Sequence, residues 1–339
     1  MRKGHFRVVV GGQDVTSRFV PLLISLTITK SSTEATQSAS FTLDDKDATA
    51  RFPKTGTPVT IELGWQGGAM RTFEGEVDTS DWSTDRGSGS VLSITARSAS
   101  LKGKVKQPAD RHWEKKKLGQ VLEDAAQDAG LSIKVHPSLA SRELEYEAQD
   151  NESFLAFADR LAREHGATFA IKGTQAGFVP RNQGVSATGQ PLPTIVITRG
   201  MVISASGLTP VTDRPRFKKK KGRWYDLHRA EQVIEEVETG DDVEPEDVLR
   251  FMEPDETSAK TRADSDRVDG ARSKGSGSVT IEGEPTAEPE GTAIIDLRAG
   301  VDGSYTIASI TDTLDRGSGY TTQISLGNPQ GSAGADDSR

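Results

Sequence analysis

A five-residue motif that occurs twice constrains the fold of this 339-residue chain more than any other feature. The sequence DRGSG occupies residues 85–89 and returns unchanged at 315–319. Each copy separates two runs in which β-branched residues recur at every second position, and glycines between such runs favour a tight turn. The motif therefore predicts two antiparallel β-hairpins, one near each end of the chain. The turn residues of interest are Asp85, Arg86 and Gly87 in the first copy and Asp315, Arg316 and Gly317 in the second.

The sequence that precedes each motif also repeats, and in the same order. SFTLD at 40–44 precedes the first hairpin, and SVTIE at 278–282 precedes the second. Between these segments and the hairpins lies a Gly-Thr pair followed by an apolar run, at 56–63 and again at 291–297. Two unrelated hairpins remain an alternative. The shared order favours one small β-domain that is used twice.

The composition supports a mainly β fold with thin barrels. Only 34% of the residues are hydrophobic and 6% are aromatic, which suits small barrels better than one large α/β core. We predict two similar antiparallel β-barrels with a helical, α+β middle domain. The predicted parts are a first barrel at 1–100, an α+β insertion at 101–182, an irregular charged segment at 183–275, a second barrel at 276–327 with strands from about 190–215, and a disordered tail at 328–339.

The hydrophobic period changes to that of a helix after residue 101. Residues 118–129 place their apolar side chains on one helical face, and Gly130 follows where a C-terminal glycine belongs. A second helix is predicted over 151–165, with Asp150 or Asn151 as its N-cap. Its buried stripe, which predicts the core of the insertion domain, includes Phe154, Phe157 and Leu161.

The segment 183–275 carries the strongest local charge. The run 217–223 is basic, with four consecutive lysines at Lys218–Lys221, and the stretch 231–256 is rich in acidic residues. A basic cluster can bind phosphates, but a solvated hairpin tip that the acidic stretch partly neutralises is the simpler interpretation. We also predict helices at 225–238 and at 258–272.

No catalytic, metal or cofactor site is evident in the sequence. The five histidines share no HxxxH or HxH spacing, there are no cysteines, and neither a GxSxG elbow nor a Walker-type loop occurs. The net charge of −8 provides no global attraction for nucleic acid or anionic lipid. No apolar stretch approaches the length of a membrane span, so we expect a soluble chain made in a cytoplasm. A glycosidase-like pair of carboxylates remains open.

Residues 146–173, YEAQDNESFLAFADRLAREHGATFAIKG, resemble the middle of the phage late control D proteins. These are tail-hub proteins of contractile phages, related in fold to the N-terminal part of VgrG proteins. The resemblance extends over most of residues 6–327 and rests on strand patterns and turn residues. The family often has a histidine where this chain has Asp312, so we assign position 312 no function on this basis.

The resemblance implies a structural virion protein of the phage tail, assembled in the host cytoplasm, and not an enzyme. Hubs of this family are described as trimers with two tube-type barrels per subunit, and a duplicated domain turns three-fold into pseudo-six-fold symmetry. The implied partners are two further copies of the chain, the tail tube protein and the central spike protein, with the tape measure protein as another candidate. DNA would only pass through a central channel, and no membrane or cofactor is involved. The alternatives are a cell-wall-degrading hydrolase that uses acidic residues of 231–256, and a nucleic-acid-binding module that uses 217–223.

Overall fold

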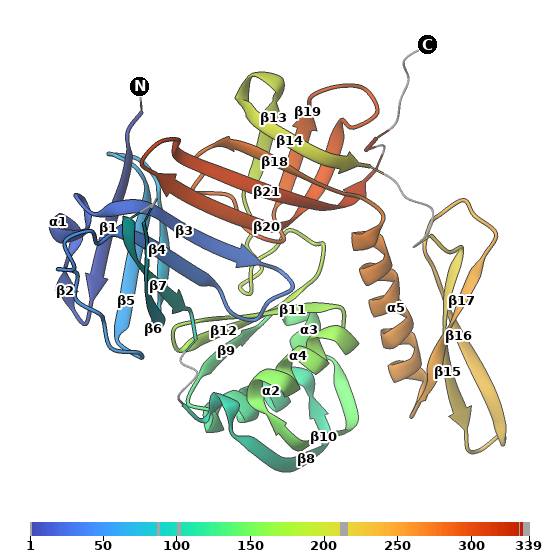
Figure 1. Ribbon diagram of the computed structural model, residues 1–339. Helices are drawn as coiled ribbons and strands as arrows, with labels where there is room; N and C mark the ends of the chain where they lie inside the picture. Colours follow the sequence, from blue (N-terminus) through green and yellow to red (C-terminus); the bar gives the residue numbers. More distant parts are fainter. Residues whose placement is uncertain (1, 87–88, 100–102, 211–215, 332, 335–339) are drawn as a thin grey trace.

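The computed structural model describes residues 2–86, 89–99, 103–210, 216–331 and 333–334 (Figure 1). Its strands form one 13-stranded sheet and three smaller sheets, so the predicted mainly β fold is confirmed. The two β units, in blue and in orange-red, lie beside each other in Figure 1, with the green insertion below them. A yellow arm stands off to the right at the end of a long helix.

The first β unit is wrapped around its own core. Its strands follow one another in space in the order β3-β4-β7-β6-β5-β1-β2. Alternate residues point inward, as in β4, where Ala39, Phe41 and Leu43 are buried and their neighbours are half-buried. The elements are β1 (Gly4–Val10), β2 (Gln13–Asp14), α1 (Thr16–Phe19), β3 (Leu23–Ser31), β4 (Ser38–Asp44), β5 (Pro58–Trp65), β6 (Met70–Asp85) and β7 (Gly89–Arg97).

The second β unit repeats this arrangement. Its order is β14-β18-β21-β20-β19-β13, so each DRGSG hairpin has equivalent neighbours on both sides. Phe41 of β4 lies opposite Ile94 in the first hairpin, and Val279 of β18 lies opposite Ile324 at the same place in the second. The elements are β13 (Thr194–Thr198), the 3-10 turn η2 (Arg199–Met201), β14 (Val202–Thr209), β18 (Ser276–Glu282), β19 (Thr292–Asp296), β20 (Gly303–Asp315) and β21 (Gly319–Gln330).

The repeat extends to individual hydrogen bonds. The amide of Val77 in β6 donates to the carbonyl of Thr57 at 2.9 Å, and the amide of Ile307 in β20 donates to that of Gly291 at 2.8 Å. A register shift follows directly after Val77 in one unit and after Ile307 in the other. One difference stands out, because β13 runs parallel to β19 whereas β1 runs antiparallel to β5.

The two units are joined by strand pairing. β20 of the second unit pairs antiparallel with β3 of the first, from Ser309 opposite Ser31 to Asp315 opposite Ser25. This pairing, which we call the intrachain joint, makes the two sheets one continuous sheet.

The insertion between β7 and β13 combines the helices α2, α3 and α4 with two small sheets. The helix predicted over 151–165 begins later, at Phe154, and Ser153 caps it by accepting from the amide of Ala156. Asp150 and Asn151 are not caps, because β10 continues through them to Ser153. The elements are η1 (Lys104–Lys106), β8 (Pro108–Lys117), α2 (Leu118–Asp128), β9 (Ser132–Val135), α3 (Pro137–Ala140), β10 (Glu143–Ser153), α4 (Phe154–Glu164), β11 (Ala167–Lys172) and β12 (Gln175–Pro180).

The segment 216–275 is regular, contrary to the prediction for 183–275. It forms a three-stranded sheet, which we call the arm, of β15 (Lys219–Asp226), β16 (Glu231–Glu238) and β17 (Glu246–Glu253). The helix predicted at 225–238 is wrong, because residues 231–238 pair along their whole length with β15. The polar helix predicted at 258–272 is present as α5 (Glu256–Ser273).

Two further observations concern the end of the chain and the helices. β21 extends to Gln330, so the predicted disordered tail from Asn328 is wrong for its first three residues, and 335–339 lie outside the described residues. The part of the predicted second barrel at 211–215 also lies outside them. Among the helices that the structure describes, none has the length and apolarity needed to cross a membrane.

Candidate functional site

The second DRGSG turn is built around the carboxylate of Asp315. Its Oδ1 accepts hydrogen bonds from the backbone amides of Gly317 at 2.7 Å and Ser318 at 3.1 Å. Gly319 then re-enters the strand at a φ of 78°, in the left-handed region that favours glycine. The turn is thus stabilised by hydrogen bonds among its own residues.

Arg316 fastens this turn to the first β unit. Its guanidinium donates to the backbone carbonyls of Leu23 at 3.2 Å and Pro21 at 2.9 Å, and its amide donates to that of Ile24 at 3.0 Å. Two of these carbonyls belong to β3, the strand that pairs with β20. The second turn is therefore part of the intrachain joint.

The first turn occupies a different environment. Asp85 closes the β6–β7 ladder opposite Gly89, and the side chains of Asp85 and Arg86 are exposed, while Gly87 lies outside the described residues. The pairing of β5 with β6 ends at Glu76. Beyond it, no described strand pairs with the outer edge of β6, and Trp82 on this stretch is 45% exposed.

A buried ion pair lies beneath the intrachain joint. Arg71 of β6 and Asp312 of β20 contact each other with side chains 1% and 0% exposed. Asp312 also accepts from the hydroxyls of Tyr320, at 3.1 Å, and Thr322. Arg71 donates in addition to the carbonyl of Ala287 at 2.7 Å. No local sequence pattern indicates this pair, because its members are separated by 241 positions in the chain.

Two further charges complete this cluster. Glu288 accepts from Arg71 at 3.1 Å and from the Nζ of Lys30 in β3 at 2.8 Å. Burial raises the pKa of Asp312 and lowers that of Lys30, which the charge of Glu288 partly opposes. Each of these charges is hydrogen-bonded to an oppositely charged partner, so the cluster fixes one β unit against the other.

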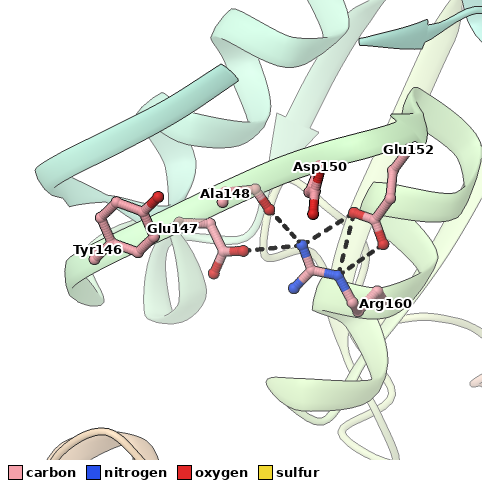
Figure 2. Close-up of a pocket in the computed structure, with 6 residues that line it drawn as sticks. All are labelled: Tyr146, Glu147, Ala148, Asp150, Glu152 and Arg160. Atoms are coloured by element: carbon pink, nitrogen blue, oxygen red, sulfur yellow. Dashed lines mark hydrogen bonds and ion pairs between the residues drawn. The ribbon is translucent and has the colours of Figure 1, made fainter. Parts of the chain in front are cut away.

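The insertion domain contains an open pocket of about 390 Å³ whose centre is an arginine (Figure 2). Arg160 of α4 donates to Glu152 at 3.0 Å, Glu147 at 3.0 Å and the carbonyl of Ala148 at 2.7 Å. Burial opposes the charge of Arg160, but the bonds to Glu152 and Glu147 outweigh it and raise its pKa. The carboxylates of Glu152 and Glu147 are both hydrogen-bonded to Arg160, so they are not free to act as a catalytic acid and base.

The predicted core residues of the insertion lie in its interior. Phe154, Phe157 and Leu161 are at most 1% exposed. Phe157 stacks on Trp113 with ring centroids 5.5 Å apart. This face of α4 is packed inside the domain.

The lysine run lies on the central strand of the arm and not at a hairpin tip. Lys219, Lys220 and Lys221 are neutralised by carboxylates of β16 and β17, which lie in the acidic stretch as predicted, and by Asp266 of α5. The shortest ion pairs are Lys219–Glu236 at 2.7 Å, Lys220–Asp247 and Lys220–Asp266 at 2.6 Å, and Lys221–Glu246 at 2.6 Å. Three of these partners, Glu236, Glu246 and Asp247, belong to the acidic stretch 231–256. Nowhere in the described ranges do three or more His, Asp or Glu residues gather as metal ligands.

The chain is similar in structure to several phage tail proteins. The 43 kDa tail protein of prophage MuSo2 from Shewanella oneidensis aligns over 96% of this chain and 98% of its own length, with a TM-score of 0.69 at 17% identity. A tail protein of Neisseria meningitidis MC58 gives the same TM-score at 12% identity and covers 98% of both chains. At these identities the likeness shows a shared fold.

Curated relatives and a family model give the same result. Probable baseplate hub proteins of Escherichia phages 186 and P2 are 32% and 29% identical over 198 and 194 residues, in each case 57% of this chain. The match covers 49% and 50% of those proteins, so the chain spans about half the length of the curated relatives it matches. The family model of the phage tail baseplate hub (GPD) matches residues 35–315. The chain belongs to the phage tail baseplate hub (GPD) family, whose members are structural components of the virion tail.

Proposed function

We propose that this protein is the structural hub of a contractile phage tail, a trimeric ring that adapts the six-fold tail tube to a three-fold central spike. The observation that carries the proposal is the intrachain joint. One chain holds two β units of equivalent strand order, paired side by side through β20 and β3. Three such chains supply six equivalent positions around an axis.

The proposed partners follow from the same geometry and from family membership. The tube protein would meet the six-fold face, the spike protein would dock on the other, and the tape measure protein would enter the channel. The E. coli c3393 protein has a similar fold, at a TM-score of 0.53 and 13% identity, and is described as a type VI secretion component that resembles T4 tail proteins gp27 and gp5. DNA would pass through the channel without being held.

The two alternative functions have less support. A hydrolase would need carboxylates free to act as acid and base, whereas Glu236 and Glu246 are bound to lysines. A nucleic-acid module would need available cations, and Lys219–Lys221 are each paired with carboxylates. Membership in a structural family argues in the same direction.

Native mass spectrometry of the full chain, alone and with the spike and tube proteins of the same phage, tests the proposal. We expect a trimer, at the latest when the spike protein is present, and annular particles in electron micrographs. A chain that stays monomeric or forms a stable dimer under all of these conditions would contradict the hub function. Peptidoglycan clearing by the purified chain would support the hydrolase instead.

A further inference from the structure

We infer that the ring closes by pairing of the outer edge of β6 in one copy with the free edge of β14 in the next copy. This inference rests on the proposed trimer and names the strands that join its subunits. The intrachain joint of β20 and β3 is the equivalent contact inside one chain.

The free part of β6 corresponds to the joined part of β20. Aligning the hairpins on DRGSG places Thr79–Asp85 on Ser309–Asp315, with a register shift at the same point before each. Ser309–Asp315 pairs on one side with β21, which is the equivalent of β7, and on the other side with β3. Thr79–Asp85 pairs with β7 on one side, and no described strand occupies its other side. Unpaired strand edges of this kind readily accept another strand.

The free edge of β14 corresponds to the joined edge of β3. Both strands pair with equivalent strands, β3 with β4 in the first unit and β14 with β18 in the second. Leu26 of β3 lies opposite Phe41, and Ala205 of β14 lies opposite Val279, which is the equivalent residue. Leu26 is completely buried, whereas Ala205 is exposed. Among the described strands, β14 therefore has no neighbour on the edge that corresponds to the joined edge of β3.

The two sets of equivalent residues also fix the register. In the intrachain joint, Thr313 lies opposite Thr27, and their hydroxyl oxygens are 3.5 Å apart. The equivalent pair across subunits is Ser83 of one copy opposite Ser206 of the next. A change of one position would exchange the two faces of the strand, so the register is specific.

Trp82 gives this contact its apolar part. It occupies the position of Asp312 and lies opposite Leu92, which is completely buried in the core of the first unit. Trp82 thus points to the core side of the sheet although 45% of it is exposed. Asp312 is covered by Arg71 of the adjoining unit in the same chain. A second copy paired on β6 would cover Trp82 in the corresponding way.

Engineered cysteines test the register directly, because the chain has none of its own. The test variant carries Ser83→Cys and Ser206→Cys, and the trimer is assembled with the spike protein before mild oxidation with diamide. We expect covalent dimers and a covalent trimer on non-reducing gels. The matched control, Thr27→Cys with Thr313→Cys, should form its disulfide inside one chain, seen as a changed monomer mobility with no covalent oligomer.

A second control places the cysteines on opposite faces. Ser83→Cys with Ala205→Cys should give at least about ten-fold less covalent oligomer than the test pair, because side chains alternate along a strand. If native mass spectrometry shows the trimer but Ser83→Cys with Ser206→Cys does not crosslink, the edges assigned here are wrong and the hub function stands. If no trimer forms for the parent chain, both the hub function and this contact are contradicted.

Discussion

The two DRGSG turns have identical sequences and different surroundings. The second is seated on the first β unit, where Arg316 donates to the carbonyls of Pro21 and Leu23. In the first, Asp85 and Arg86 are exposed at the end of a hairpin whose outer edge has no partner among the described strands. The shared sequence specifies the turn, and residues nearly three hundred positions away decide whether the turn is covered.

The same contrast applies along the two strands. Asp312 and Trp82 hold equivalent positions, but Asp312 is completely buried in an ion pair while Trp82 is half-exposed. The two β units are thus joined within the chain through β20 and β3, whereas the equivalent edges of β6 and β14 have no partner among the described strands.

The largest difference should appear at Asp312 and Trp82. Asp312→Ala removes the buried carboxylate partner of Arg71 and leaves its guanidinium, among the described residues, only the partly exposed Glu288 as a carboxylate partner, so the free energy of unfolding measured in urea should fall by about 3–5 kcal/mol. Trp82→Ala should cost less than about 1 kcal/mol in the monomer, because this side chain is already partly in water. The double variant Arg71→Met with Asp312→Leu serves as the control and should recover most of the loss. Equal effects at positions 312 and 82 would contradict the comparison.

The insertion domain has no counterpart in the repeat and shows what burial and neighbouring cations do to a titrating group. Burial, with the nearby charges of Arg142 and Arg160, lowers the pKa of His165 to about 3, against about 6.5 in the unfolded chain. Between these values the unfolded chain binds a proton that the folded chain does not. Stability should therefore rise with pH across this window, by up to about 1.4 kcal/mol per pH unit. His165→Gln should reduce the slope in denaturant titrations, and an unchanged slope would mean that His165 is protonated when folded.

A smaller difference is expected at the two turn arginines. Arg316→Ala removes two hydrogen bonds from a guanidinium to backbone carbonyls of the other unit, which should cost about 1 kcal/mol in thermal unfolding because the site is partly solvated. Arg86→Ala is the matched variant and should stay within about 0.5 kcal/mol of the parent. If Arg86→Ala proved the more damaging of the two, the first turn would have to be covered in the monomer.

The smallest effect concerns the lysines of β15, which form a basic run in the sequence but are ion-paired in the structure. The lysines of β15 are paired with carboxylates, so the chain should show no retention of duplex DNA in gel shifts at about 150 mM salt. A histone-like basic protein would serve as the positive control. Retention that disappears when Lys218–Lys221 are replaced by glutamine would show that these charges are available.

Local patterns in the sequence were sufficient for the hairpins and for α2. The alternation around DRGSG, the apolar face of 118–129 and Gly130 each act over a few residues, which is the range that a sequence pattern covers. The local pattern gives a wrong prediction at 231–238, because EQVIEEVE spaces its apolar residues as a helix would. Its β-branched residues instead pair with β15, whose lysines match its glutamates across the sheet.

The candidate site was only partly accessible from the sequence. The two turns were identified by their repetition, but the pair of Arg71 and Asp312 joins residues that no local signal connects. An isolated aspartate in a strand, such as Asp312, gives no indication that it is buried. The start of α4 was misplaced because Asn151, a good cap by composition, lies in β10 with a φ of 49°.

The attachment of the arm has a mechanical consequence. β15 lies so close to α5 that a Cβ at Gly222 would overlap the carbonyl of Ala259, and Lys220 is bonded to Asp266 of the same helix. At its other end, α5 is anchored through Arg272 to Glu290. Glu290 in turn accepts from Thr168 of the insertion domain at 2.8 Å. A load applied to the arm would therefore pass along α5 to Glu290, whose amide donates to the carbonyl of Ile307 of the second β unit, and through Asp269 of the same helix to Arg181 just beyond β12.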